Sequence, residues 1–328
     1  MSEETIIRDE HGAKFDKYLT RITPFGFSGA LLVSKKGEVV LNKGYGMAIR
    51  EKNICNTAET VFNIGSLTKQ FTASAIMKLE MQDKLNTNDR LDKYVNNVPV
   101  DKEGITIHHL LTHTAGVINY TGEDHEMAHR DETIHKILDA PLLFTPGKDF
   151  KYSNAGYSLL AAVIELVSRK SYEEYLSDHL FKPAGMTVTG YRIPNWKERM
   201  IANWYIGETN NGTHLERPYP YWNLLGNGGI LSTTDDMFKW YLALKSDSIL
   251  SSGAKKKLFT PFLKNYAYGW GVEKAEHGTL IQHDGANDLG SSADFTWFVD
   301  FDLVTILLCN QSYGEALLIS QVRDKIER

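Results

Sequence analysis

A serine and a lysine stand three positions apart at the start of an apolar-periodic segment, as Ser66 and Lys69. Residues 67–82 are good helix formers without proline or glycine, which predicts a helix that begins beside Ser66. At this spacing the two side chains share one helix face and can form a hydrogen bond. Because a serine hydroxyl becomes nucleophilic when a neighbouring base takes its proton, we predict Ser66 as a nucleophile and Lys69 as its base.

A second grouping, Tyr152-Ser153-Asn154, could complete such a site. It precedes an apolar helix predicted over residues 159–167, and this places it in the loop before that helix. A tyrosine can shuttle a proton, and an asparagine can bind an amide.

A third grouping, His283-Asp284-Gly285-Ala286, is predicted at the end of a strand that starts near Thr279, and it holds the only His-x-Gly in the chain. Glycine lets a ligand approach the strand backbone closely, and the Ala286 N–H could stabilise an oxyanion. A histidine at a strand end can also be purely structural.

The first two patterns also occur elsewhere, so neither is specific by itself. Ser252 and Lys255 repeat the serine–lysine spacing, and Tyr94-Val95-Asn96 and Tyr221-Trp222-Asn223 repeat the tyrosine–asparagine spacing. Only the occurrence of all three groupings in one order along the chain can indicate a particular family.

The composition limits the class of protein. A length of 328 residues suggests about two domains, and a formal net charge of -5 argues against a nucleic-acid partner. The apolar run Leu303–Cys309 is too short to span a membrane and predicts a buried strand. The first residues do not resemble a signal peptide, so we expect a cytoplasmic protein, or the mature domain of an exported one. With only Cys55 and Cys309 present, a disulfide framework is excluded.

The predicted elements imply an α+β fold in which an antiparallel sheet is built from the two ends of the chain and flanked by helices. Residues 1–85 and 226–328 would form this sheet domain, and residues 86–225 an all-helical domain, with the site in the cleft between them. The elements predicted for the sheet domain are a helix over 12–22, a hairpin over 28–43 that turns at Lys36-Gly37, strands over 279–283, 293–299 and 303–309, and a closing helix over 314–327.

The three groupings occur in the chain order of the penicillin-recognising serine hydrolases, and the chain resembles their class C-like branch. That branch contains class C β-lactamases, D-alanyl-D-alanine carboxypeptidases, D-aminopeptidases and related esterases. Connecting segments that also look like this family are residues 107–117, 182–186, 228–233 and 268–271. The resemblance implies a β-lactamase/transpeptidase-like fold.

The resemblance also implies roles for individual residues. Ser66 would attack a carbonyl carbon, with Lys69 and Tyr152 sharing its proton as base and then acid. Asn154 would hold the acyl amide of the substrate. The backbone N–H groups of Ser66 and Ala286 would form the oxyanion hole.

His283 occupies the place of the lysine in the Lys-Thr-Gly motif of many β-lactamases, with Gly285 as its glycine. Asp284 departs from the family, because a threonine or serine that helps to bind a substrate carboxylate usually stands there. If Asp284 faces the cleft it would repel such a carboxylate; otherwise it is a solvated surface charge.

Histidines four apart, His109 with His113 and His125 with His129, could each share a helix face and bind zinc. Neither pair has the glutamate of the His-Glu-x-x-His pattern, and we expect no metal and no cofactor.

The expected function is that of a serine hydrolase that forms an acyl-enzyme on a small-molecule or peptide substrate, either a small ester or an amide of a D-amino-acid peptide. A β-lactamase and a D-alanyl-D-alanine carboxypeptidase are the alternatives within the class. An acylated sensor that never deacylates, or an acyltransferase, are alternatives of another kind.

Overall fold

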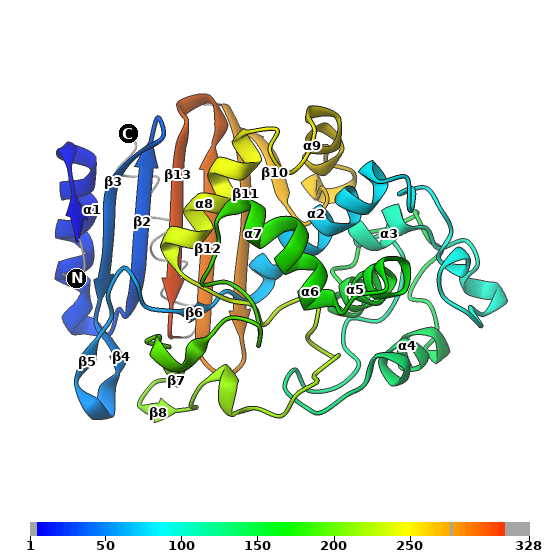
Figure 1. The fold of residues 1–328 in the computed structure, drawn as a ribbon, viewed down its shortest axis with the longest axis horizontal. Coiled ribbons are helices and arrows are strands. Elements are labelled where there is room, and N and C mark those ends of the chain that lie inside the picture. The colour runs from blue at the N-terminus through cyan, green and yellow to red at the C-terminus, as the bar shows by residue number, and fades with distance from the viewer. Residues whose placement is uncertain (1–4, 276–277, 312–328) are drawn as a thin grey trace.

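A seven-stranded antiparallel sheet forms the centre of the computed structural model, which describes residues 5–275 and 278–311. The strand order is β1-β3-β2-β13-β12-β11-β10, so β2 from the start of the chain pairs with β13 from residues 303–309 inside the sheet, and β1 lies at one edge (Figure 1). The strands are β1 (Ile6–Ile7), β2 (Gly29–Lys35), β3 (Glu38–Tyr45), β10 (Gly271–Ala275), β11 (Gly278–Asn287), β12 (Ser291–Phe298) and β13 (Leu303–Cys309).

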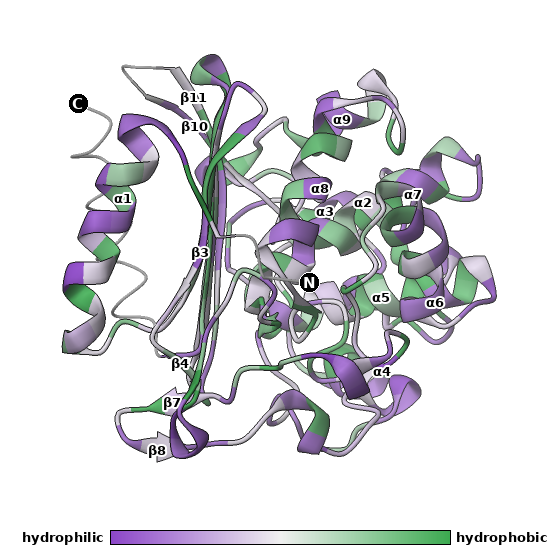
Figure 2. Cartoon of the chain, turned by 60° about the vertical axis from the view of Figure 1, so that its left-hand side comes forward, coloured by the Kyte–Doolittle hydropathy of each residue, from purple (hydrophilic) through white to green (hydrophobic). Residues whose placement is uncertain are grey.

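The two faces of the sheet are covered differently, as Figure 2 shows: α1 (Asp9–Ile22) lies on one face, and the other helices lie on the opposite side. Successive strand residues point to opposite faces, and β2 illustrates this. Leu31 and Val33 pack in the cluster that contains Phe15 of α1, whereas Ala30 and Leu32 join the larger core on the other face.

The helices on that side are α2 (Thr68–Met81), α3 (Ile107–Leu111), α4 (Arg130–Asp139), α5 (Asn154–Ser168), α6 (Tyr172–Leu176), α7 (Lys182–Ala184), α8 (Thr234–Lys245) and α9 (Ser252–Leu258). Short strands outside the main sheet are β4 (Met47–Ile49), β5 (Ile54–Cys55), β6 (Phe62–Asn63), β7 (Tyr205–Ile206), β8 (Thr209–Asn210) and β9 (Leu231–Ser232). Among the described residues, no helix combines the length and the apolar character needed to cross a membrane.

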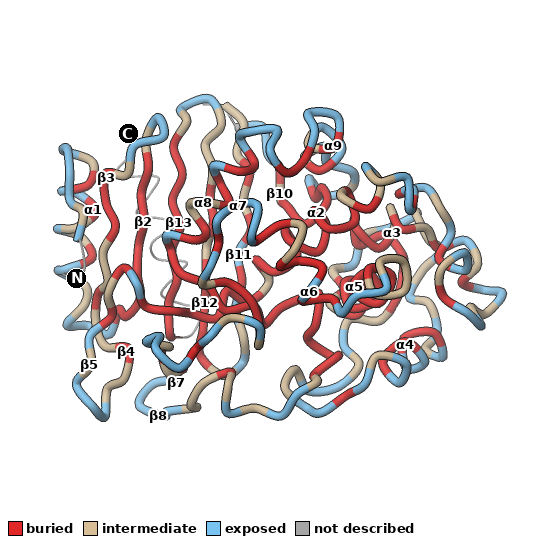
Figure 3. The backbone as a smooth tube through the Cα atoms, in the orientation of Figure 1, coloured by how far each residue is buried: buried red, intermediate tan, exposed pale blue. Residues whose placement is uncertain are grey.

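Helix α2 is buried all round rather than along one stripe (Figure 3). Its polar side chains, Thr68, Lys69, Gln70, Thr72 and Ser74, are buried together with its apolar ones. Burying polar side chains costs free energy of folding unless they find hydrogen-bond partners. Lys69 therefore lies in an environment that is unusual for a lysine.

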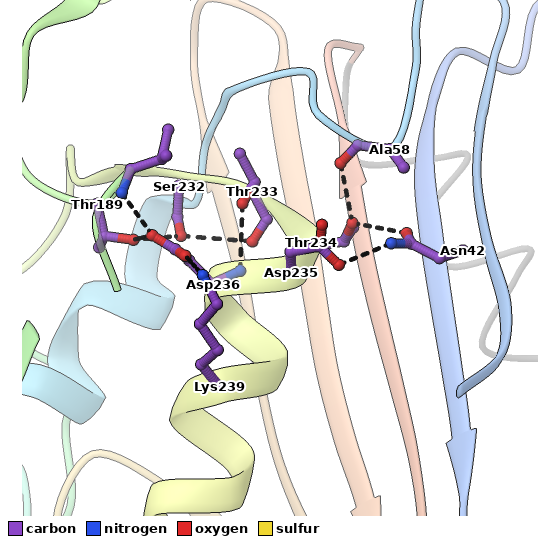
Figure 4. Close-up of polar contacts among 10 residues, drawn as sticks. Asn42, Ala58, Thr189, Ser232, Thr233, Thr234, Asp235, Asp236 and Lys239 are labelled. Atoms are coloured by element: carbon purple, nitrogen blue, oxygen red, sulfur yellow. Dashed lines mark hydrogen bonds and ion pairs between the residues drawn. The ribbon is translucent and has the colours of Figure 1, made fainter. Parts of the chain in front are cut away.

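The N-terminus of α8 is tied to its surroundings through the buried Asp236 (Figure 4). Its backbone N–H donates to the Thr233 hydroxyl at 3.2 Å, which caps the helix. Its carboxylate accepts from the N–H of Val188 at 2.7 Å and from the hydroxyl of Thr189 at 3.0 Å, and it pairs with Lys239 at 2.7 Å.

The next residues tie α8 to the sheet (Figure 4). Thr234 donates to the Asn42 side chain of β3 at 2.9 Å, and Asn42 donates to Asp235 at 2.8 Å. This junction fixes β9 just before α8, and β9 pairs with β6, in the register Asn63↔Leu231. The strand that leads into Ser66 is therefore held by a segment that lies about 170 positions later in the chain.

The predicted antiparallel sheet flanked by helices is confirmed, and so is its construction from both ends of the chain. One prediction needs correction: the strand expected over 279–283 continues to Asn287, so His283 to Ala286 lie inside β11 and not at its end. The pairing of β11 with β12 extends to Asn287↔Ser291, which supports the extra length. The predicted helix over 314–327 lies outside the described residues, and the domain boundaries stay a prediction.

Candidate active site

Ser66 lies in a single 3-10 turn, η3 (Gly65–Leu67), that runs directly into α2. Gly65 takes a positive φ of 50°, a conformation that glycine adopts without strain, and its N–H donates to the Asn63 side chain at 2.8 Å. Gly65 and Leu67 are buried, but Ser66 is partly exposed. The turn therefore presents the serine hydroxyl at the mouth of a buried helix.

Lys69 is fully buried, and its Nζ lies 3.1 Å from Ser66 Oγ, 2.8 Å from Asn154 Oδ1 and 2.7 Å from the Asn227 carbonyl oxygen. Burial lowers the pKa of Lys69 well below its ordinary value, against the smaller opposing effect of Asp124 and Asp284. The two asparagine oxygens can only accept. In its neutral form the amine can donate two protons to these oxygens and offer its lone pair to the Ser66 hydroxyl.

Tyr152 stands beside this amine, with its ring centroid 4.8 Å from Lys69 Nζ. The buried ring of His113 packs on Tyr152 at a centroid distance of 4.3 Å, and His113 Nδ1 accepts from the Ser153 N–H at 3.1 Å. Burial lowers the pKa of His113 well below its ordinary value, so this ring is neutral at pH 7. His113 thus supports Tyr152, a contact that no sequence pattern predicted.

Asn154 is the first residue of α5, whose N-cap is Ser153. Its backbone N–H donates to the Asn119 side chain at 2.9 Å, which fixes the start of the helix. Because Asn154 Oδ1 accepts from Lys69, its Nδ2 donor is turned away from the amine.

The turn Gly65–Leu67 holds the predicted nucleophile and is called the nucleophile turn below. The backbone of β11 touches this turn directly. A Cβ on Gly285 would lie 2.5 Å from the Ile64 carbonyl oxygen and 2.6 Å from Ser66 N, and a Cβ on Gly65 would lie 2.7 Å from Ala286 N. Neither position has room for a larger residue. This contact brings the backbone N–H groups of Ser66 and Ala286 to the same part of the site, and it is the reason for a glycine at position 285.

His283 lies on the same strand but is only 6% exposed. Its Nδ1 donates to the Asp284 carbonyl oxygen at 2.5 Å, and its Nε2 accepts from the Tyr266 hydroxyl at 3.0 Å. Burial lowers the pKa of His283 to about 4, so the ring is neutral at pH 7. Both ring nitrogens are engaged within the protein, which leaves the ring poorly suited to hold a substrate anion.

The cavity at Ser66 has a volume of about 420 Å³ and an acidic lining. Asp124, Asp284 and Asp288 line it, and none of the described residues that line it is a lysine or an arginine. Burial raises the pKa of Asp124 to about 6. Asp284 itself is exposed.

The repeated motifs are not sites. Ser252 donates to Asp247 at 2.9 Å, and Lys255 pairs with Asp247 at 2.8 Å, so this pair lacks the contact between hydroxyl and amine. The Tyr94 hydroxyl is bonded to Asp89, and that of Tyr221 to a buried histidine, His214.

The histidine pairs do not share a helix face. α3 ends at Leu111, so His113 lies beyond it, and α4 begins at Arg130, after both His125 and His129. That part of the zinc hypothesis was wrong, because a spacing of four fixes a common face only within a helix.

The chain belongs to the Beta-lactamase family, whose family model matches residues 24–324. It is 36% identical to the putative penicillin-binding protein PbpX of Bacillus subtilis over 99% of this chain and 80% of that protein. It is 30% identical to penicillin-binding protein 4* of the same organism, over 89% and 71%. The solved structure of the octameric penicillin-binding protein homologue from Pyrococcus abyssi superimposes with a TM-score of 0.81, at 28% identity, over 95% of this chain and 78% of the other. The predicted fold class and family are confirmed, and the protein is a serine hydrolase of the β-lactamase type.

Proposed function

We propose that the protein hydrolyses a small ester, or an amide of a D-amino-acid peptide, through an acyl-enzyme on Ser66. The observation that carries this proposal is the buried Lys69 amine, 3.1 Å from Ser66 Oγ and hydrogen-bonded to two oxygens that can only accept. Such an amine is ready to take the proton of Ser66.

In acylation, Ser66 Oγ attacks the carbonyl carbon while its proton passes to Lys69. The backbone N–H groups of Ser66 and Ala286 stabilise the oxyanion, and Asn154 Nδ2 binds the acyl amide of the substrate. When the intermediate collapses, the proton passes through Tyr152 to the leaving alcohol or amine. Gly285 allows β11 to lie against the nucleophile turn, and His283 holds the same strand to Tyr266.

The charge of the cavity supports a substrate without a carboxylate beside the scissile bond. Asp124, Asp284 and Asp288 would repel such a group, and the buried, neutral His283 offers it no compensating charge. Neutral esters and substrates with a free amino group fit better than β-lactams or peptide C-termini. We therefore rank β-lactamase and carboxypeptidase activity below esterase and D-amino-acid amidase activity.

A comparison of kcat/KM for a short neutral ester, a D-amino-acid amide, a D-Ala-D-Ala peptide and a chromogenic cephalosporin tests this ranking. We expect the first two to react fastest. Ser66→Ala should abolish acylation and turnover, a loss on the order of a millionfold, and Ser252→Ala should change neither. A chain that prefers the cephalosporin or the carboxylated peptide contradicts the substrate class, and equal losses in both serine variants contradict the choice of nucleophile.

A further inference from the structure

A small cavity beside Ser66 carries polar groups that the acylation steps do not use. Its volume is about 20 Å³, which is room for the centre of one water molecule. Residues from five parts of the chain line it. Among them are three that acylation does not use, Asn63, Asp124 and Asn287 of β11, together with Asn154 of α5.

Two of the amide side chains that line this cavity have a buried donor without a hydrogen-bond partner among the described residues. Asn63 is 2% exposed; its Oδ1 accepts from the Gly65 N–H at 2.8 Å, and its Nδ2 has no partner among the described residues. Asn287 Oδ1 accepts from the N–H groups of Leu289 and Ser291, each at 3.0 Å, and its Nδ2 likewise has no partner in the described part of the chain. Buried donors of this kind bind water or a ligand atom.

The third group is Asp124, and the side chain of Asn223 holds the loop that carries it. Asn223 accepts from the Thr121 hydroxyl at 2.6 Å and donates to the Glu123 carbonyl oxygen at 3.0 Å, so the backbone just before Asp124 is fixed. Within residues 5–275 and 278–311, nothing forms a hydrogen bond to the Asp124 carboxylate. A half-buried acceptor and two buried donors therefore belong to residues that border the same small cavity as Ser66.

We propose that Asp124 is the general base of deacylation, acting on a water molecule that Asn63 and Asn287 hold beside the acylated Ser66. This inference rests on the proposed function and deepens it, because it assigns the second half of the reaction. It makes the protein a hydrolase and not an acylated sensor.

The water oxygen forms a bond to the acyl carbon while the Asp124 carboxylate takes one water proton. The tetrahedral intermediate then collapses, the bond from carbon to Ser66 Oγ breaks, and the proton on Asp124 returns to Ser66 Oγ. The product leaves as a carboxylic acid.

The charges around Asp124 suit a base that works near neutral pH. Burial, Asp288 and Glu123 raise its pKa to about 6, and Lys69 opposes them. Burial lowers the pKa of His125, which also borders the small cavity, to about 4, and that of His283 to the same value, so neither ring titrates near pH 6. Above pH 6 Asp124 is ionised and can accept a proton.

Pre-steady-state kinetics with p-nitrophenyl acetate separate the two half-reactions, because the burst reports acylation and the steady state reports deacylation. For Asp124→Asn we expect a burst rate within about threefold of wild type and deacylation slower by roughly 10²–10⁴-fold, the usual contribution of a general base. The acetyl-enzyme should then accumulate in intact-mass spectra. Glu123→Gln removes the same charge from the same loop and should leave both rates within about threefold.

Three further measurements distinguish a general base at position 124 from a residue with a purely structural role. The wild-type deacylation rate should fall below about pH 6, and Asp124→Asn should lose this dependence. Hydroxylamine, which attacks without a base, should restore turnover in the variant. Asp124→Glu should recover part of the rate.

Equal slowing of burst and steady state, or no slowing of either, would overturn the assignment of Asp124. A variant that hydroxylamine does not rescue would also overturn it. If wild-type protein forms no acyl-enzyme with either the ester or a D-amino-acid amide, the proposed function fails first, and this inference fails with it.

Discussion

In the proposed mechanism, the central pair of residues is Lys69 and Tyr152, and burial prepares Lys69 to act as a base. A lysine on the protein surface is charged at pH 7, but the fully buried Lys69 has its pKa lowered well below that of a free lysine. Its Nζ lies 4.8 Å from the Tyr152 ring centroid, so the amine and the aromatic ring are direct neighbours.

We predict strong coupling between these two residues. Lys69→Ala and Tyr152→Phe should each reduce the acylation rate by several orders of magnitude, and the double variant should lose far less than the product of the two losses. Burst kinetics of all four proteins provide the measurement. Fully multiplicative losses would mean that the two side chains do not share a proton path.

A second residue-scale prediction concerns Asp284. Two unit charges about 4 Å apart interact by roughly 4 kcal/mol at an effective dielectric constant near 20, and solvent reduces this value at an exposed position. Asp284→Thr should therefore raise kcat/KM for carboxylated substrates by roughly ten- to a thousandfold, since about 1.4 kcal/mol is a factor of ten.

Neutral acetate esters serve as the internal control for this variant, because their kcat/KM should barely respond. The comparison needs a D-Ala-D-Ala peptide, a cephalosporin and the ester, each with wild type and variant. A uniform change over all three, or no change, would show that Asp284 does not act on the substrate charge.

At the scale of elements, the contact between β11 and the nucleophile turn determines the geometry of the site. Gly285→Ala would insert a Cβ 2.6 Å from Ser66 N and push the two backbones apart. Because a displacement of about 1 Å can cost a hundredfold in rate, we expect kcat/KM to fall by at least about 10².

Gly271→Ala on the neighbouring strand β10 is the matched control for Gly285→Ala. Its Cβ would lie 3.4 Å from the Gln282 carbonyl oxygen, an ordinary contact, so kcat/KM should stay close to that of wild type. If both alanine variants are fully active, the strand does not need to approach Ser66 so closely.

The variant Asp236→Ala tests how much the junction between α8 and its neighbours contributes to stability. Asp236→Ala removes a buried carboxylate that accepts from Val188 and Thr189 and pairs with Lys239, so we expect unfolding to require about 2–3 kcal/mol less free energy. Urea unfolding measures this loss. The exposed Asp139 is the control, and Asp139→Ala should change the free energy of unfolding by no more than about 0.5 kcal/mol. Equal effects in the two variants would contradict the role of the junction.

At the scale of the whole molecule, the net charge of -5 and the acidic cavity have the same sign. Their combined field should attract cationic substrates and repel anionic ones, and salt should weaken both effects. Lowering the ionic strength from about 0.15 M to about 0.01 M extends the screening length from roughly 8 Å to 30 Å.

We therefore predict that this change raises kcat/KM for a D-amino-acid amide with a free amino group, on the order of tenfold, and lowers it for an anionic substrate. A neutral ester should be unaffected. Salt titrations of all three substrates give the measurement, and an identical response of the cation and the anion would contradict the electrostatic account of specificity.

Much of this protein follows from local sequence. The helix after Ser66, the hairpin at Lys36-Gly37 and the strand Leu303–Cys309 could be predicted, because their hydrophobic periodicity and turn residues are local signals. The order of the three polar groupings indicated the family, because two of the three patterns recur elsewhere in the chain but the three occur together in this order only once.

Only the tertiary structure decided which groups meet, since contacts between distant segments leave no local pattern. Asn227 accepts from Lys69 across 158 positions of the chain, and His113 packs on Tyr152 from another loop. Asp124 has no motif at all, and its raised pKa arises from burial and from neighbours that folding supplies. The sequence determined the kind of chemistry through residue type and spacing, whereas protonation states depend on solvent exclusion, which exists only in the folded chain.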